Sequence, residues 1–207
     1  MKKLLGLIIA LLFLSCFNRS LSNDLTEITL SSQISSTIAT STGNSKIIYF
    51  ENGTCKCPDA SVGDTVTIND VTYTAVDNST LIEQIQNENV NLCTSLVTDM
   101  SSLFQSNIVF NSVIDFWDTA DVTNMEEMFK EAIAFNQDLS NWDTSSVIDM
   151  SGMFESTSSF NEDIGSWNTT SVMDMRYMFK YASSFNQNIE NWDTSNVTDM
   201  AGMFQEA

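Results

Sequence analysis

The chain has 207 residues, enough for one or two compact domains, and its 8 Lys and Arg residues against 27 Asp and Glu residues give a formal net charge of −19. A surface this negative repels phosphate groups, which excludes nucleic acid and anionic lipid headgroups as favourable partners. The chain contains no His, so the commonest general base and the commonest metal ligand are both missing.

Residues 1–15 are predicted to be a lipoprotein signal peptide. Two Lys residues precede an apolar run, residues 4–14, that is too short to span a bilayer, which needs about 20 residues. The run ends at Ser15-Cys16, which resembles a lipobox and implies cleavage before Cys16 and lipidation of that residue. We therefore expect an exported protein, lipid-anchored on the outer surface of the bacterial cell envelope, that meets the membrane only through its lipid. An ordinary secretory signal with a chance Cys is the alternative.

Residues 16–45 are predicted to be a flexible tether. From Ser20 to Ser45, 13 of 26 residues are Ser or Thr, and the apolar residues are scattered. Such a tract buries too little apolar surface to offset the entropy lost on ordering. A loose strand laid along the rest of the protein is the alternative.

Residues 46–96 are predicted to form a small β-rich module that caps the segment after it. The pattern of β-branched residues and turn residues predicts two hairpins, with strands at 46–50, 54–57, 65–68 and 71–74. Asp77-Asn78-Ser79 is expected to cap a helix over residues 80–86.

Three of the four Cys residues lie in this module. Cys55 and Cys57 are two apart on a strand, so they face the same side and cannot readily pair with each other. Export favours a disulfide from one of them to Cys93, and Cys57–Cys93 is the candidate pair. Free thiols and a Cys-x-Cys metal site are weaker alternatives, and we expect no bound metal or cofactor.

Residues 97–207 repeat every 25 residues, with four complete units and a partial fifth that begins at Val197. A fixed period of this length is typical of a solenoid, in which each unit buries its apolar face against its neighbours. Within a unit, apolar residues at i, i+3, i+4 and i+7 predict a two-turn helix after a short strand, with Asp149 and its equivalents as the helix cap. The Asn that follows the second Phe, such as Asn136, is expected to form an inward ladder between coils.

The predicted repeat core consists of apolar residues that recur at this spacing. They are Val122, Met125, Met128, Phe129, Phe135, Trp142, Val147, Met150, Met153, Phe154, Phe160, Trp167, Val172, Met175, Met178, Phe179, Phe185 and Trp192. Charged residues at varying positions, such as Lys130, Glu155 and Arg176, are expected on an exposed helix face, together with Ser151.

Two motifs at fixed offsets carry a family resemblance. They are Val-Thr-Asn-Met-Glu-Glu-Met-Phe at residues 122–129 and Phe-Asn-Gln-Asp-Leu-Ser-Asn-Trp-Asp-Thr-Ser at residues 135–145. The chain from about residue 93 resembles the BspA-like bacterial surface repeat, which occurs in mycoplasma lipoproteins and is related to leucine-rich repeats. The resemblance implies an α/β, leucine-rich-repeat-like solenoid of strand and short-helix repeats, exposed on the cell surface and used in adhesion or binding.

The expected function is non-catalytic presentation of this solenoid to an unknown surface protein or glycan. Acidic residues are plentiful but recur in step with the repeat, whereas a catalytic pair should occur once, so an enzyme, such as a fragment of a carbohydrate-active one, is the less favoured hypothesis. A calcium-stabilised surface repeat protein is the alternative, with turn carboxylates at Asp138, Asp143, Glu162 and Asp163.

The sequence stops after the predicted helix of the fifth unit, at Ala207. An uncapped last coil would expose Trp192, Val197, Met200, Met203 and Phe204. This predicts either a fragment of a longer repeat protein or end-to-end self-association.

Overall fold

The computed structural model describes residues 48–207, which all belong to one compact unit of the chain. The predicted signal peptide, Cys16, the tether over residues 16–45 and the first two residues of the predicted cap lie outside the described residues. Among the residues that are described, no helix is long and apolar enough to cross a membrane.

Two antiparallel hairpins begin the described part of the chain. Their strands are β1 (Tyr49–Glu51), β2 (Thr54–Lys56), β3 (Thr65–Ile68) and β4 (Val71–Asp77). The turn residues Asn52 and Gly53 have φ of 51° and 89°, and Asn69 and Asp70 have 50° and 64°. Positive φ at both central residues matches the right-handed twist of the flanking strands, which is why Asn, Asp and Gly occupy these turns.

A helix and a parallel strand follow the hairpins. Helix α1 (Asn78–Gln86) is capped by Asp77, whose carboxylate accepts hydrogen bonds from the backbone N–H groups of Ser79 and Thr80 in a capping box. Leu81 is the buried residue of α1. Strand β5 (Leu92–Leu96) pairs in parallel with β4, so the sheet order is β3-β4-β5. The sequence pattern did not predict β5 as a strand.

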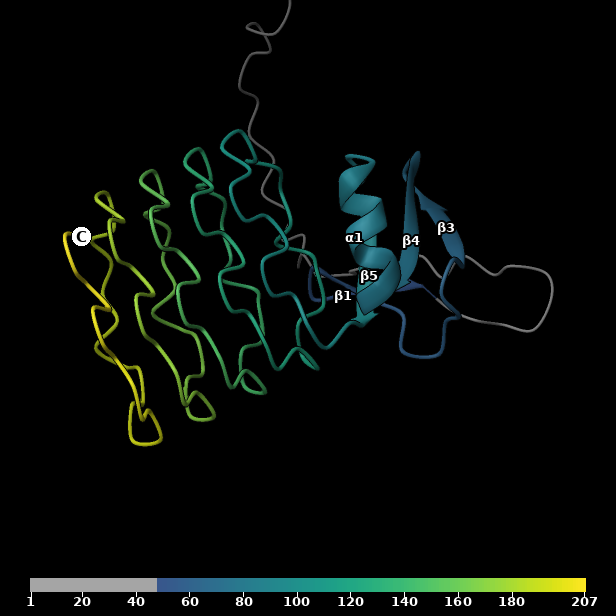
Figure 1. The fold of residues 1–207 in the computed structure, drawn as a ribbon. Helices are drawn as coiled ribbons and strands as arrows, with labels where there is room; N and C mark the ends of the chain where they lie inside the picture. The colour runs from purple at the N-terminus through teal and green to yellow at the C-terminus, as the bar shows by residue number, and fades with distance from the viewer. Residues whose placement is uncertain (1–47) are drawn as a thin grey trace, which may run out of the picture. The chain divides into compact units, whose positions relative to one another are not determined.

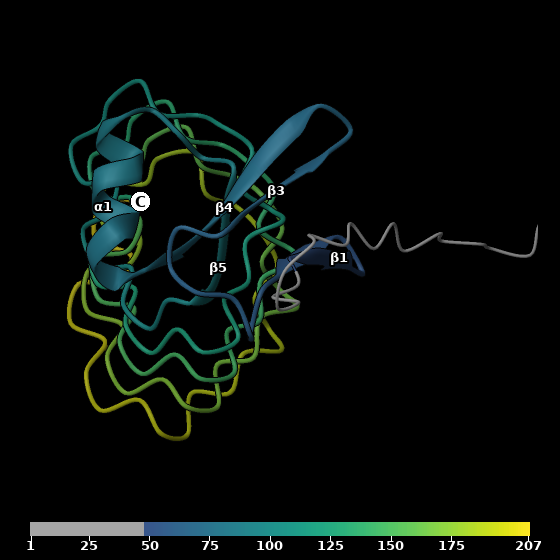
Figure 2. The same cartoon turned by 90° about the vertical axis from the view of Figure 1, so that its right-hand side faces the viewer.

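Residues 97–207, which we call the repeat stack, form coils that lie side by side in sequence order (Figure 1). Parallel bridges join equivalent residues of successive coils, from Asp99 through Asn124, Asp149 and Asp174 to Asp199. Viewed along the stack, the coils overlie one another (Figure 2). The 25-residue period of the sequence is therefore the length of one coil.

The short helix expected in each unit is not formed. Residues 101–106, 126–131, 151–156, 176–181 and 201–206 are consecutive turns. In the second of these segments, Glu127 and Glu131 have left-handed φ of 53° and 60°, and their amides donate to carbonyls of the next coil, Ser151 and Glu155, at 2.9 and 2.8 Å. An amide bonded to the neighbouring coil cannot bond the carbonyl four residues back, so this ladder replaces the helix.

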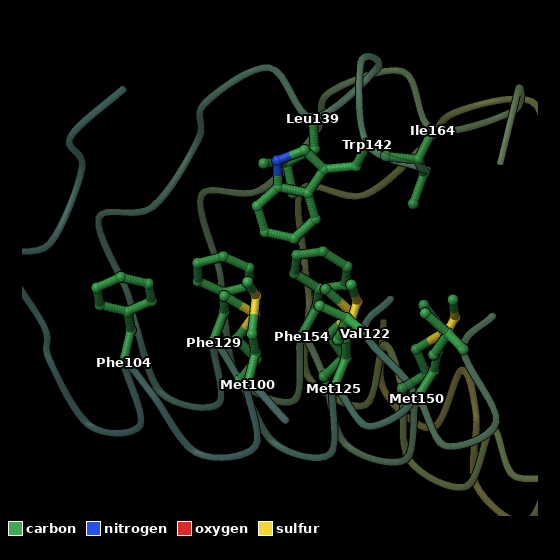
Figure 3. Packing of buried hydrophobic residues seen from close by; sticks show 14 of the residues in the cluster. Met100, Phe104, Val122, Met125, Phe129, Leu139, Trp142, Met150, Phe154 and Ile164 are labelled. Atoms are coloured by element: carbon green, nitrogen blue, oxygen red, sulfur yellow. The ribbon is translucent and has the colours of Figure 1, made fainter. Parts of the chain in front are cut away.

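Apolar side chains from successive coils stack in columns inside the repeat stack. Figure 3 shows Met100, Met125 and Met150 in one row and Phe104, Phe129 and Phe154 in the next. The rings of Phe129 and Phe154 are nearly parallel, with centroids 5.6 Å apart. All the predicted core residues are buried except Phe185, which is half-buried.

Candidate interaction surface

The Trp column lies inside the stack and links the coils. The indole Nε1 of Trp142 donates to the Ile114 carbonyl of the preceding coil at 3.1 Å. Trp167 donates to Leu139, and Trp192 donates to Ile164, at the same distance. All three side chains are buried, so their faces are not available for a ligand to stack on.

A column of buried Thr residues links the coils on the following turn. The hydroxyls of Thr119, Thr144 and Thr169 donate to backbone carbonyls of the next coil at 2.9–3.0 Å. Thr94 in β5 makes the same bond to Asp118, which makes β5 the first rung of the column. We did not predict this role, although the recurring Asp-Thr-Ser and Asn-Thr-Thr triplets were a signal for it.

Asn side chains form a ladder, but on the outside of the stack. The Oδ1 of Asn111, Asn136 and Asn161 accepts the backbone N–H of the equivalent Asn in the next coil at 2.7–2.9 Å. These side chains are exposed or half-exposed, not inward as expected. A short amide on a surface turn can reach the next coil without being desolvated.

The acidic residues considered for calcium are held by local turns. The carboxylates of Asp138, Asp143 and Asp163 each accept the amide two residues further on, at 2.8–3.0 Å, and Glu162 accepts the Asn136 side-chain amide at 2.6 Å. Asp149 and its equivalents make the same kind of Asx turn instead of capping a helix. Residues 48–207 contain no group of three or more His, Cys, Asp or Glu side chains placed to hold a metal ion.

The junction between β5 and the first coil contains a disulfide and a polar network. Cys57 and Cys93 are joined, with Cα atoms 6.1 Å apart. Ser95 Oγ accepts the Cys57 amide at 2.9 Å and donates to the Asp118 carboxylate at 2.5 Å. Lys56 Nζ pairs with the same carboxylate at 2.7 Å, so the buried charge of Asp118 is compensated.

Cys55 carries the unbonded thiol among the described cysteines, and it is fully buried. Burial, together with the negative charge of Asp118, raises the pKa of the Cys55 thiol from 9.0 to about 12. A thiol of this kind is an inert core group and not a nucleophile at neutral pH.

Several columns that vary between coils lie on the consecutive turns, which together form a surface we call the turn face (residues 101–106, 126–131, 151–156, 176–181 and 201–206). Arg176, Ala201 and Gln205 are exposed there, and Lys130 and Glu155 are half-buried. Ser151 was expected to be exposed but is buried. It stands in one column between Glu126 and Arg176, whose longer side chains flank it.

Ion pairs run across the turn face from coil to coil. Lys130 Nζ lies 2.6 Å from Glu127 and 3.1 Å from Glu155, and Lys180 reaches the same Glu155 at 3.3 Å. The hydrogen bond to Glu127 raises the pKa of Lys130, and burial opposes it. Partly exposed pairs contribute little stability individually, so their main effect is to hold side chains in place.

The fourth unit, residues 172–196, carries aromatic residues on the turn face. Tyr177 and Tyr181 are each 41% exposed and have left-handed φ of 57° and 59°. The Nζ of Lys180 lies 4.8 Å from the centroid of the Tyr177 ring and 5.1 Å from that of Tyr181. Both distances fall within the range of cation–π attraction.

Comparisons with known proteins give one match. A family model described as "Mycoplasma protein of unknown function, DUF285" matches residues 72–169 and 138–207, which together cover more than half of the chain. The comparisons with curated proteins and with solved structures return no match. The matched region starts in β4 and continues through α1, β5 and every coil of the repeat stack. The chain therefore belongs to the family of mycoplasma proteins of unknown function called DUF285.

Proposed function

We propose that this protein is a non-catalytic cell-surface lipoprotein whose repeat stack, a leucine-rich-repeat-like solenoid, binds a protein or glycan partner. Membership of a mycoplasma family is compatible with a surface protein. The proposal rests mainly on a difference in sequence variation between the buried columns beneath the turn face and the columns on its surface. The core columns repeat the same residues, whereas one column of the turn face reads Glu126, Ser151, Arg176 and Ala201, of which all but Ser151 are exposed.

This contrast suits a binding module because the framework does not depend on the varying side chains. Backbone amides of the turn face donate to the next coil, as Phe129 does to Met153 at 2.9 Å. A substitution at an exposed column leaves such a bond unchanged. Stacked repeats provide extended surfaces of this kind, on which a partner can be recognised by several coils at once.

An array experiment tests the binding proposal. The full-length chain, purified in detergent micelles and fluorescently labelled, is applied to one array of purified extracellular proteins and another of glycans. We expect saturable binding to a small set of related spots, with competition by unlabelled chain. Uniform weak binding that unlabelled chain does not displace on either array would reject the proposed function.

A separate experiment tests the proposed lipid anchor. The wild-type chain should partition into the detergent phase of Triton X-114 and incorporate labelled fatty acid, whereas Cys16→Ala should do neither, because several acyl chains are needed for stable anchoring. Cys55→Ala is the matched control, since it removes a thiol that is buried in the fold. Equal partitioning and labelling of wild type and Cys16→Ala would remove the anchor from the proposal.

A further inference from the structure

The fourth unit departs from the repeat at the turn face and nowhere in its core. Tyr177 shares a column with Ser102, Glu127, Gly152 and Gly202. The column of Tyr181 holds two Ser residues and two Glu residues, at positions 106, 131, 156 and 206. Large aromatic side chains therefore occur once in each column and in the same coil.

The backbone does not require Tyr at either position. A left-handed φ costs an L-residue with a Cβ atom roughly 1–2 kcal/mol and costs Gly almost nothing, which explains Gly152 and Gly202 at the first column. An aromatic residue in this conformation is rare and is found where the surrounding structure or a function demands it. The same turn is formed with Gly, Ser or Glu in the first column and with Ser or Glu in the second, so the two Tyr residues point to a function of their exposed rings.

Both rings have contacts within the protein itself. Lys180 contacts both rings and is itself paired with Glu155 at 3.3 Å. The Tyr177 ring also lies against Gly202, where an added Cβ atom would come within 2.6 Å of a ring carbon. Such contacts restrict the two rings, and a restricted side chain loses less entropy on binding.

Further exposed apolar side chains occur earlier in the same coil and in the preceding coil, and the exposed guanidinium of Arg176 directly precedes Tyr177 in the chain. Met173 and Ile148 are 51% and 45% exposed and belong to adjacent coils, with the Met173 amide donating to the Ile148 carbonyl at 2.8 Å. Thr occupies their column in the neighbouring coils. Tyr, Met and Arg are enriched in protein–protein interfaces, whereas Ser and Glu, which other coils carry here, are depleted.

Carboxylates surround this surface in excess of cations. Arg176 pairs with Asp174 at 2.7 Å and lies 3.6 Å from Asp199. Asp174, Asp199 and Asp149 all raise the pKa of Arg176, and Asp149 and Asp174 also raise the pKa of Glu126, which burial raises most. Arg176 in turn lowers the pKa of Glu126, so four carboxylates interact with one guanidinium, and a partner with basic groups at its edge would complement them.

We propose that Ile148, Met173, Arg176, Tyr177 and Tyr181 form a docking surface for a protein segment with an apolar centre flanked by Lys and Arg. This inference rests on the proposed function and assigns it to two adjacent coils and one class of partner. The two Tyr rings and Met173 contact the apolar centre, and the surrounding carboxylates contact the basic flanks.

Synthetic peptides test the docking surface directly. All peptides share one apolar centre of Leu, Phe or Trp residues. They differ in their flanks, which are basic (Lys and Arg), neutral (Ser) or acidic (Asp and Glu). Their binding to the full-length chain in micelles is measured by fluorescence anisotropy. The test variant is Tyr177→Gly with Tyr181→Ser, which installs the residues of the preceding coil. The control variant is Ile108→Ser with Ile133→Ser, which removes exposed apolar surface elsewhere and installs the residues of later coils in that column. Urea unfolding of both variants checks that they remain folded.

We expect the basic-flanked peptides to bind best and to lose affinity as NaCl rises from about 50 to 500 mM, because salt screens exposed charges. The test variant should weaken this binding by about tenfold or more, and the control by less than about twofold. Equal weakening by both variants, equal binding of the three flank types, or no binding of any peptide overturns the inference. If only a glycan binds and this binding depends on the two Tyr residues, the inference is wrong but the proposed function stands. If neither the protein array nor the glycan array shows binding, the inference and the proposed function are both wrong.

Discussion

At the scale of single residues, the coils are joined by buried side chains that donate to backbone carbonyls. Trp117 bonds the Val90 carbonyl between α1 and β5, at 3.0 Å, in the same way that later Trp residues bond the preceding coil. No buried side-chain nitrogen or oxygen in residues 48–207 lacks a partner. The Trp and Thr columns therefore fix the register between coils, which a purely apolar core would leave less specified.

Trp142 shows how much one such bond contributes. Trp142→Phe keeps a buried ring but leaves the Ile114 carbonyl without its donor, which should cost about 1–3 kcal/mol in the free energy of unfolding. Trp142→Ala should cost about 3–5 kcal/mol, because it also opens a cavity. Urea titration measures both, and Val113→Ala, at an exposed site, is the control and should change stability by less than about 0.5 kcal/mol. A Trp142→Phe variant as stable as wild type would show that the indole bond contributes nothing.

Cys55 provides a test by pH. Its folded pKa is raised from 9.0 to about 12, so its stabilising contribution is fully present below pH 9 and is lost as the pH rises towards 12. The pKa of Tyr73 is also raised, mainly by burial, so its ionisation at high pH lowers the stability of the folded state as well. We expect native protein at pH 8 to resist alkylation by iodoacetamide at Cys55. The fall in stability above pH 9 should be smaller in Cys55→Ala, and rapid alkylation of the native state would contradict the buried geometry.

At the scale of elements, the sequence predicted the core columns and both hairpins but not the local backbone of each unit. Spacing of i, i+3 and i+4 for Met125, Met128 and Phe129 fits a helix face, and it also fits turns whose inward residues return every three or four positions. Gly152 and Gly202, which have positive φ, were a signal for turns. Strand β5 was missed because its pairing with β4 depends on a crossover through α1. The docking surface was not predicted because exposure and ring contacts depend on which residues stack in one column.

The cap of α1 should weaken in acid. Hydrogen bonds from Thr80 first, and then from Ser79, lower the pKa of the Asp77 carboxyl from 3.8 to about 2. The stabilisation of the folded state by the ionised Asp77 carboxylate is therefore present above pH 3.8 and is lost as the pH falls through 2. The protection of the Ser79 and Thr80 amides from exchange, relative to an unfolded peptide at the same pH, should fall over this range in wild type, and in Asp77→Ala it should already be low at pH 5. Protection of the Thr80 amide that stays constant from pH 5 to 2 would contradict the capping role.

The disulfide links the end of the β2 hairpin to β5. It closes a loop with a sequence separation of 36 residues, for which loop entropy predicts a contribution of up to about 4 kcal/mol. Cys57→Ala with Cys93→Ala should lower the urea midpoint by a corresponding amount, while Cys55→Ala leaves the bridge intact. Mass spectrometry of the non-reduced protein should find Cys57 and Cys93 in one linked peptide. Finding Cys55, Cys57 and Cys93 all as free thiols would reject the bridge.

At the scale of the whole molecule, the acidic charge follows in part from the repeat, because the same turn recurs in every coil. Many Asp residues recur because each coil needs Asx turns at the same positions, as at Asp143 and Asp193. A hydrogen bond from the Ser195 amide lowers the pKa of Asp193, so the turn favours the charged form. The net charge of −19 therefore comes in part from local backbone geometry, and its cost in self-repulsion is reduced by salt.

Because each coil bonds its two neighbours, removing one whole coil should leave the rest in register. Deletion of residues 147–171 joins Ser146 to Val172 and places Asp174 where Asp149 bridged Asn124. The shortened chain should fold cooperatively, with a lower free energy of unfolding and a smaller urea m-value, since less surface is buried. Deletion of residues 147–170 is the matched control. It removes one residue fewer and shifts every later Met, Phe and Trp by one position, so the core columns no longer align. Circular dichroism and urea titration should show this control to be far less stable. Two variants of equal stability would mean that the 25-residue register does not hold the coils together.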